Sequence, residues 1–180
     1  NPGFETDVNA PNTFTFGAPT DWLPYNIEAV SGETIGTLNP TGTSYFTAGQ
    51  WTGGNVGIAY MDVGGTEGVE FGIRQVLAAT LQANTIYTLD VGVGNIASGT
   101  SNLGGGDIFF NLDGFPGYRV ELRAGGVTLA ADANNLTIPE AEFRNSQVIF
   151  NSSGVDAGLL GQQLEIRLVN LNLLDPTAPG

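Results

Sequence analysis

The chain has 180 residues, a length that suits one domain, and 41% of them are hydrophobic, which is enough to bury a core. Its five basic residues, all arginine, face 18 acidic ones, and the net charge of -13 argues against a nucleic-acid partner, because phosphates need a basic face. Cysteine, histidine and lysine are absent, which excludes disulfides, Ser-His triads, Schiff bases and sites built on thiolate or imidazole. No apolar run is long enough to predict a membrane span.

Alternation of apolar and polar residues at the strand period recurs along the chain and predicts about ten short antiparallel strands. In chain order they are residues 13–16, 22–30, 55–62, 69–74, 87–93, 108–112, 118–123, 127–131, 147–151 and 164–168. Gly-, Pro- and Asn-rich turns separate them, among them residues 99–106, and one helical turn is predicted at residues 139–143. Short strands interrupted this often predict one all-β jelly-roll sandwich over residues 1–180.

Acidic residues beside the predicted turns are the candidate metal ligands. Glu5 ends the opening Asn-Pro-Gly-Phe-Glu segment, which resembles the N-terminal motif that gives jelly-roll carbohydrate-binding modules a calcium ligand. Further oxygen donors of the kind calcium prefers lie beside turns: Asp62, Asp90, Asp107, Asp113 and Asp132. We therefore predict calcium as the cofactor, with simple solvation of these acids as the alternative.

Aromatic residues gather in the Gly-rich first third of the chain, where loops at one end of a sandwich often form a binding surface. Tyr60, Trp51, Trp22 and Tyr25 are the predicted ligand-binding residues, because their rings can stack on an indole or a sugar. For Tyr60, packing in the core is the alternative. Tyr45 and Phe46 belong to the same aromatic group.

Several segments in a fixed order carry a family resemblance: residues 1–5, 13–16 before Trp22, 55–57, 81–89, 113–122 and 165–172. Together they make the chain similar to the Stig cyclases, calcium-dependent cyanobacterial enzymes that shape hapalindole-type indole alkaloids. The resemblance implies a calcium-bound jelly-roll dimer acting on an isonitrile-bearing indole joined to a monoterpene. The implied chemistry is an acid-promoted Cope rearrangement followed by cyclisation, and Tyr60, in its Val-Gly-x-x-Tyr setting, is similar to a pocket residue of that family.

The catalytic acid is not assigned. The resemblance implies an aspartate on a strand that follows the segment matched by residues 167–172, whereas Asp175 precedes Pro176 in a loop context and does not receive the role. A sandwich that lacks its terminal strand exposes an unpaired edge, which we predict beside residues 164–170. That edge would pair with a continuation of the chain or with a strand from another chain.

Three functions follow from these observations. The first is a cyclase of the Stig type, which takes an indole-terpenoid. The second is a non-catalytic extracellular carbohydrate-binding module, and the third is a self-associating surface or filament protein completed by a neighbour's strand. The chain begins at Asn1 rather than Met, so we expect a secreted or periplasmic protein with its signal peptide removed or not included, and we expect a homo-oligomer.

Overall fold

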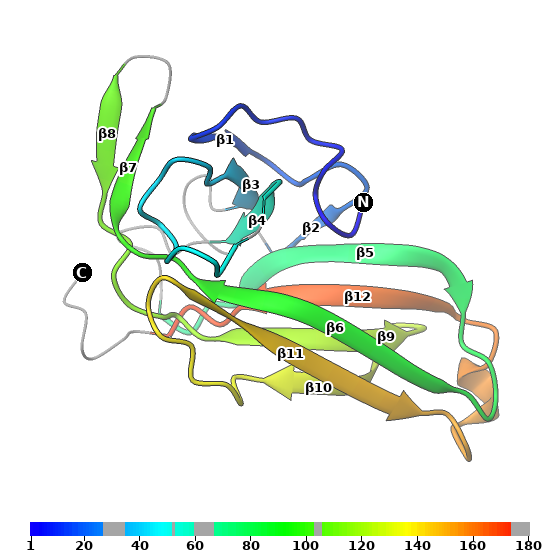
Figure 1. The fold of residues 1–180 in the computed structure, drawn as a ribbon. Coiled ribbons are helices and arrows are strands. Elements are labelled where there is room, and N and C mark those ends of the chain that lie inside the picture. The colour runs from blue at the N-terminus through cyan, green and yellow to red at the C-terminus, as the bar shows by residue number, and fades with distance from the viewer. Residues whose placement is uncertain (27–34, 52, 60–66, 103–105, 174–180) are drawn as a thin grey trace.

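The computed structural model describes residues 1–26, 35–51, 53–59, 67–102 and 106–173, and these residues form strands and one short 3₁₀ turn, η2 (Ala157–Leu159) (Figure 1). The strands are β1 (Thr13–Phe16), β2 (Leu23–Tyr25), β3 (Ile35–Asn39), β4 (Val56–Ala59), β5 (Phe71–Thr80), β6 (Ile86–Asn95), β7 (Gly99–Asn102), β8 (Asp107–Phe110), β9 (Tyr118–Ala124), β10 (Val127–Ala133), β11 (Glu142–Asn151) and β12 (Gln163–Asn170). The predicted all-β class is confirmed. No helix in the described part of the chain is long and apolar enough to cross a membrane.

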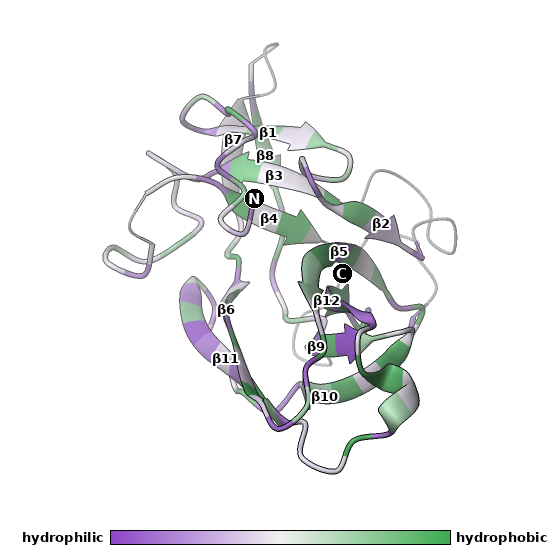
Figure 2. Ribbon diagram, turned by 90° about the vertical axis from the view of Figure 1, so that its right-hand side faces the viewer, coloured by the Kyte–Doolittle hydropathy of each residue, from purple (hydrophilic) through white to green (hydrophobic). Residues whose placement is uncertain are grey.

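The strands form the two layers of a jelly-roll sandwich (Figures 1 and 2). One layer is a single five-stranded antiparallel sheet in the order β10-β9-β12-β5-β2. The facing layer contains two smaller sheets, β1-β3-β4 and β11-β6, and the hairpin β7-β8 projects from one end of the molecule. All the pairs are antiparallel, as the sequence predicted.

Two apolar clusters hold the layers together. The larger cluster packs inward residues of β9 and β12, such as Val120, Leu122 and Leu164, against Val148 on β11 and the inner face of β6. The smaller cluster joins β5 to β3 through Phe71, which is fully buried, and its neighbours Trp22, Ile35 and Ile73. Each half of the facing layer therefore has its own core against the continuous sheet.

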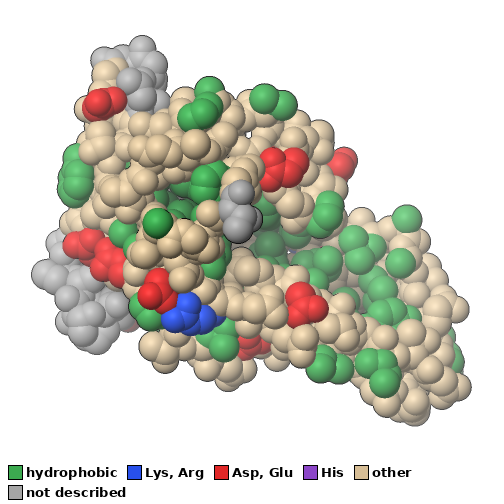
Figure 3. Space-filling model, viewed as in Figure 1, with side chains coloured by type: hydrophobic (Ala, Val, Ile, Leu, Met, Phe, Trp, Pro, Cys, Tyr) green, Lys and Arg blue, Asp and Glu red, His purple; other side chains and the backbone are tan. Residues whose placement is uncertain are grey.

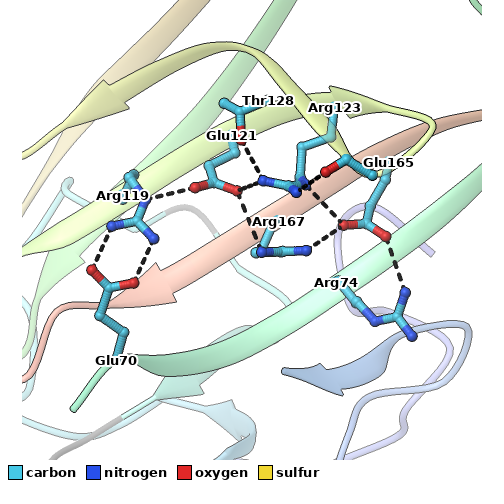
Figure 4. Close-up of polar contacts among 9 residues, drawn as sticks. Glu70, Arg74, Arg119, Glu121, Arg123, Thr128, Glu165 and Arg167 are labelled. Atoms are coloured by element: carbon cyan, nitrogen blue, oxygen red, sulfur yellow. Dashed lines mark hydrogen bonds and ion pairs between the residues drawn. The ribbon is translucent and has the colours of Figure 1, made fainter. Parts of the chain in front are cut away.

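The outer face of the five-stranded sheet carries a ladder of charged residues (Figure 4). Because side chains alternate along a strand, Arg119, Glu121 and Arg123 of β9 lie next to Glu165 and Arg167 of β12 on the face opposite the core. Glu121 is only 5% exposed and accepts from Arg119 at 2.7 Å and from Arg123 at 2.8 Å. Four of the chain's five arginines, the fourth being Arg74, belong to this network.

Two local predictions are wrong. Residues 139–143 do not form a helical turn: Ala141 has a positive φ of 62°, the Glu142 amide bonds to the Pro139 carbonyl in a turn, and β11 starts at Glu142. Residues 99–106 are not wholly a turn, since β7 covers Gly99–Asn102. A helical turn needs a negative φ at each residue, and the positive φ of Ala141 interrupts it. This explains the first error.

The predicted open edge beside residues 164–170 is also wrong. β12 lies inside the five-stranded sheet, with β9 on one side and β5 on the other. Its apolar inner face, with Leu164, Ile166 and Leu168, does reflect an interior strand, but both neighbours come from earlier in the chain.

Candidate functional site

A cavity of about 400 Å³ lies between the two layers, where Figure 3 shows hydrophobic side chains in a hollow of the surface. Its walls come from the N-terminal segment, both halves of the facing layer and the inner face of the continuous sheet. The main lining residues are Phe4, Phe14, Leu38, Tyr45, Phe46, Asn55, Val56, Ile58, Ile73, Val91, Val93, Ile96, Ser101, Phe110, Leu112, Phe115, Tyr118, Val120, Phe143 and Leu168. A cavity of this size and apolar character suits a small hydrophobic ligand.

The cavity occupies the place where the facing layer is interrupted. Among the described strands, β4 pairs with β3 and β6 pairs with β11, and neither pairs with the other. Residues 56–58 of β4 and 91–94 of β6 both line the cavity. Within the described residues, β4 and β6 are therefore edge strands that border the cavity, whereas β12 is an interior strand.

Glycines on the cavity strands make room for aromatic rings. A Cβ at Gly57 would lie 2.8 Å from the Phe4 ring, and one at Gly94 would lie 2.6 Å from the Phe143 ring. These are closer than carbon atoms approach one another, so the rings can lie against the strands only because no side chain is there. Phe143 also packs on Phe46, with ring centroids 4.5 Å apart.

One part of the cavity wall is polar. The hydroxyls of Tyr45 and Ser101, both buried, share a hydrogen bond of 2.6 Å, and burial raises the pKa of Tyr45. Tyr118, on the inner face of β9, donates its hydroxyl to Asp132 Oδ2 at 2.6 Å. Burial, together with this bond to a carboxylate, raises the pKa of Tyr118 to about 12, so its phenol stays protonated at neutral pH.

Asp132 lies behind Tyr118 on β10 and is 6% exposed. Its Oδ2 also accepts from Ser146 Oγ at 2.6 Å, and its Oδ1 accepts from Asn135 Nδ2 at 2.7 Å and from the Asn135 amide at 3.3 Å. Burial alone would raise its pKa, but the bonds from Ser146, Tyr118 and Asn135 outweigh burial and lower the pKa. Asp132 is therefore an anion held by neutral donors.

No Asp or Glu lines the cavity among the residues that the structure describes. The charged lining residue is Arg119, and its guanidinium binds Glu70 in a two-point contact at 2.6 and 2.5 Å. That guanidinium belongs to the charged outer face. The described cavity thus presents hydroxyl and amide groups as its polar side chains.

The predicted ligand-binding aromatics do not come together at this cavity. Trp22 is buried in the smaller core cluster behind Phe4, with its indole N–H bonded to the Asn1 carbonyl at 2.9 Å. Tyr25 lies under the Arg167 guanidinium, which is 4.1 Å from its ring centre. Trp51 is half-buried and lines a smaller adjoining pocket of about 140 Å³ that shares Phe46. Tyr60 lies outside the described residues.

The predicted calcium ligands are also separate. Glu5 accepts from the Asn55 amide at 2.8 Å, and Asp90 accepts from the side chains of Asn145 and Gln147 across the β6-β11 pair. Asp113 lies beside Ser98 and next to Glu140, whose pKa is raised by burial and by that neighbouring carboxylate. Asp62 lies outside the described residues. The described part of the chain contains no group of three or more acidic side chains placed to share a metal ion.

Sequence reasoning missed most of the lining residues. Phe4 and Tyr118 lie in segments that carry the family resemblance, but neither was predicted to line a ligand site. The inner-face period of β9, which places Tyr118 with Val120, was the available signal. Phe110 and Phe143 come from distant segments, and nothing local in the sequence marks them as neighbours.

Fold and cavity together define a jelly-roll protein with an apolar cavity between its two layers. The model of the HpiC1-like family, described as HpiC1 cyclase, matches residues 1–178. A Stig cyclase, Fisc from Fischerella sp. TAU, solved in complex with (3Z)-3-(1-methyl-2-pyrrolidinylidene)-3H-indole, is 36% identical, with a TM-score of 0.79 over 96% of this chain and 86% of that one. The chain belongs to this family of Stig cyclases.

Two further solved structures agree with this assignment. A cyclase from Fischerella sp. TAU in complex with 4-(1H-indol-3-yl)butan-2-one is 35% identical, with a TM-score of 0.79 and coverage of 96% and 86%. An apo-form cyclase from Fischerella sp. is 32% identical, with a TM-score of 0.77 and coverage of 96% and 85%. No curated protein matches the chain significantly. The family supports a cyclase function in indole alkaloid biosynthesis.

Proposed function

We propose that this chain cyclises an indole joined to a monoterpene and bearing an isonitrile, by an acid-promoted Cope rearrangement followed by ring closure. The observation that carries the proposal is the aromatic-walled cavity of about 400 Å³ in a chain of this family. An indole can lie against the rings of Phe4, Phe46 or Phe143, and the flexible terpene can fold against the aliphatic residues of β4 and β6.

The cavity acts by confinement and by excluding water. Holding a flexible chain in one folded shape removes much of the entropic barrier to ring closure. Aromatic faces also attract developing positive charge on carbon, and an apolar wall keeps water from trapping that charge. None of the described lining side chains is a carboxylic acid, so a carboxylic proton donor would have to come from outside this set.

A deep, mainly apolar cavity between the layers favours this function over a sugar-binding module. Sugar-binding sites present rings on an open platform with many polar partners, whereas Trp22 and Tyr25 here are engaged by the core and by Arg167. The ligands of the two solved relatives are both indoles, which supports an indole as the ligand of this chain.

The test has a binding arm and a turnover arm. Titration with 4-(1H-indol-3-yl)butan-2-one, followed by calorimetry, should show binding that Phe143→Ala weakens by roughly tenfold or more. Incubation with the indole-monoterpene isonitrile should give a cyclised isomer of unchanged mass, detected by chromatography and mass spectrometry. Asp156→Asn, which keeps the cap of η2 and lies away from the cavity, is the matched control. Absence of both binding and turnover would refute the proposal.

We also propose a structural calcium ion at Glu5. Its carboxylate and the carbonyls of Phe4 and Asp7 gather around Asn55, to whose N–H groups they are hydrogen-bonded, and such oxygens are the donors that calcium prefers. Calcium should then raise the melting temperature by several degrees, because it binds the folded state alone. Glu5→Gln should lose this gain and Asp156→Asn should keep it. An identical melting curve in calcium and in excess chelator would contradict the proposal.

A further inference from the structure

The proposed function leaves the buried carboxylate of Asp132 without a role. It is 6% exposed, and its four hydrogen bonds all come from neutral groups on Tyr118, Ser146 and Asn135. A buried carboxylate usually has a cationic partner or lies at a functional site. All five arginines instead form ion pairs with glutamates, four on the outer face of the sheet and Arg144 with Glu142.

Tyr118 connects Asp132 to the cavity. Its hydroxyl donates to Asp132, while the residue lines the cavity beside Phe115, whose ring centre is 6.1 Å away. A phenol that donates to a carboxylate has a more electron-rich ring, and an electron-rich ring attracts cations more strongly. The negative charge itself also acts across the low-dielectric wall.

We propose that the Tyr118 wall of the cavity is a cation-binding surface, on which Asp132 makes the cavity select ligands and intermediates that carry positive charge beside the Tyr118 ring. This inference rests on the proposed function, because ring closure initiated by a proton passes through cationic carbon skeletons. Asp132 is a positioning residue in this scheme. It touches Tyr118 and not the ligand.

Two indole probes separate charge from shape. The pyrrolidinylidene-3H-indole accepts a proton at nitrogen to give a cation spread over both rings, whereas 4-(1H-indol-3-yl)butan-2-one stays neutral. The pKa of the basic probe should be higher when it is bound to the wild-type protein than when it is free. The absorbance spectrum of the bound probe, recorded as pH is varied, measures this pKa. The pKa of the bound probe should rise by about one unit, which equals about a tenfold preference of the cavity for the cationic form.

Asp132→Asn should remove most of this rise in the probe's pKa. It should also weaken binding of the cationic probe about tenfold, with little effect on binding of the neutral ketone. Tyr118→Phe keeps the ring and should give a smaller loss in the same direction, which preserves the test if Asp132→Asn does not fold. Asp156→Asn removes an equal charge at the surface and should change neither probe, because solvent screens that charge.

The outcomes are distinct. Two results would overturn the inference but leave the indole cavity in place. One is an equal change in affinity for both probes in Asp132→Asn and in Tyr118→Phe, and the other is a bound probe whose pKa equals that of the free probe. Either result would mean that the Tyr118–Asp132 pair is only structural. Failure of both probes to bind the wild-type protein would overturn the proposed function, and the inference with it.

Discussion

The five-stranded sheet and the layer that faces it differ in how completely their strands are paired. In the sheet, every interior strand has two neighbours, and its outer face is closed by ion pairs around Glu121 (Figure 4). In the facing layer, β1-β3-β4 and β11-β6 are separate sheets (Figure 2). Residues of β4 and β6 both line the cavity. The continuous strand pairing of one layer is interrupted in the other, and the cavity lies at that interruption.

Matched phenylalanine truncations test this comparison with the largest expected effect. Phe71 on β5 is fully buried between the layers, so Phe71→Ala should cost about 3–5 kcal/mol of unfolding free energy. Phe143 on β11 borders the cavity and leaves fewer packed neighbours behind, so Phe143→Ala should cost about 1–2 kcal/mol. Urea unfolding of the two variants measures both values. Equal losses would mean that the facing layer is packed as firmly as the sheet.

The second test compares how much one ion pair in each layer contributes to stability. Glu121→Gln leaves Arg119, Arg123 and Arg167 without their shared, buried carboxylate and should cost about 3 kcal/mol. Glu142→Gln breaks an ion pair with Arg144 on β11, where both side chains are far more exposed, and should cost less than about 1 kcal/mol. Thermal and urea unfolding at low and high salt compare them. A small cost at Glu121 would show that the outer-face network is only a surface feature.

The continuous sheet was also the layer that the sequence predicted best. β9 and residues 164–168 of β12 alternate between apolar inner residues and charged outer ones, so their period was visible. β3 was missed because Ile35–Asn39 is buried on both faces and shows no alternation. β7 was missed because Gly99–Asn102 is made of small and polar residues that are typical of turns.

The cavity could not be predicted in the same way. It depends on which segments meet, and Phe4, Tyr45 and Phe143 meet only because the sandwich closes. Trp22 and Tyr25 had the same aromatic chemistry as these residues, but the fold directs them to the core and to the outer face. Composition can therefore indicate an aromatic site, whereas its members follow from strand register and topology.

The hydroxyl of Tyr118 joins β9 to its neighbour β10 through Asp132, and its ionisation makes the stability of the protein fall at high pH. Its pKa is raised from 10.0 to about 12, so its contribution is fully present below pH 10 and is lost as the unfolded tyrosine ionises between pH 10 and pH 12. The expected loss over that interval is roughly 2–3 kcal/mol. Tyr118→Phe should show a shallower loss, since the other tyrosines are common to both proteins. Parallel pH profiles of urea unfolding would contradict this reading.

The smallest expected effect concerns the space between β4 and β6. Gly94→Ala places a Cβ 2.6 Å from Phe143 Cε1, so the ring must move, which should cost about 1–2 kcal/mol and weaken binding of the indole ketone several-fold.

Gly92→Ala is the matched control on the same strand. Its Cβ would meet Phe143 Cδ1 at 3.9 Å, an ordinary contact, and both glycines line the cavity. We expect Gly92→Ala to be neutral or slightly stabilising, because alanine loses less backbone entropy than glycine on folding. Unfolding and calorimetric titration of the pair separate ring placement from the general effect of a methyl group on β6. If both variants behave alike, Gly94 does not set the position of Phe143, and the shape of this cavity wall must come from the rings that pack on Phe143 instead.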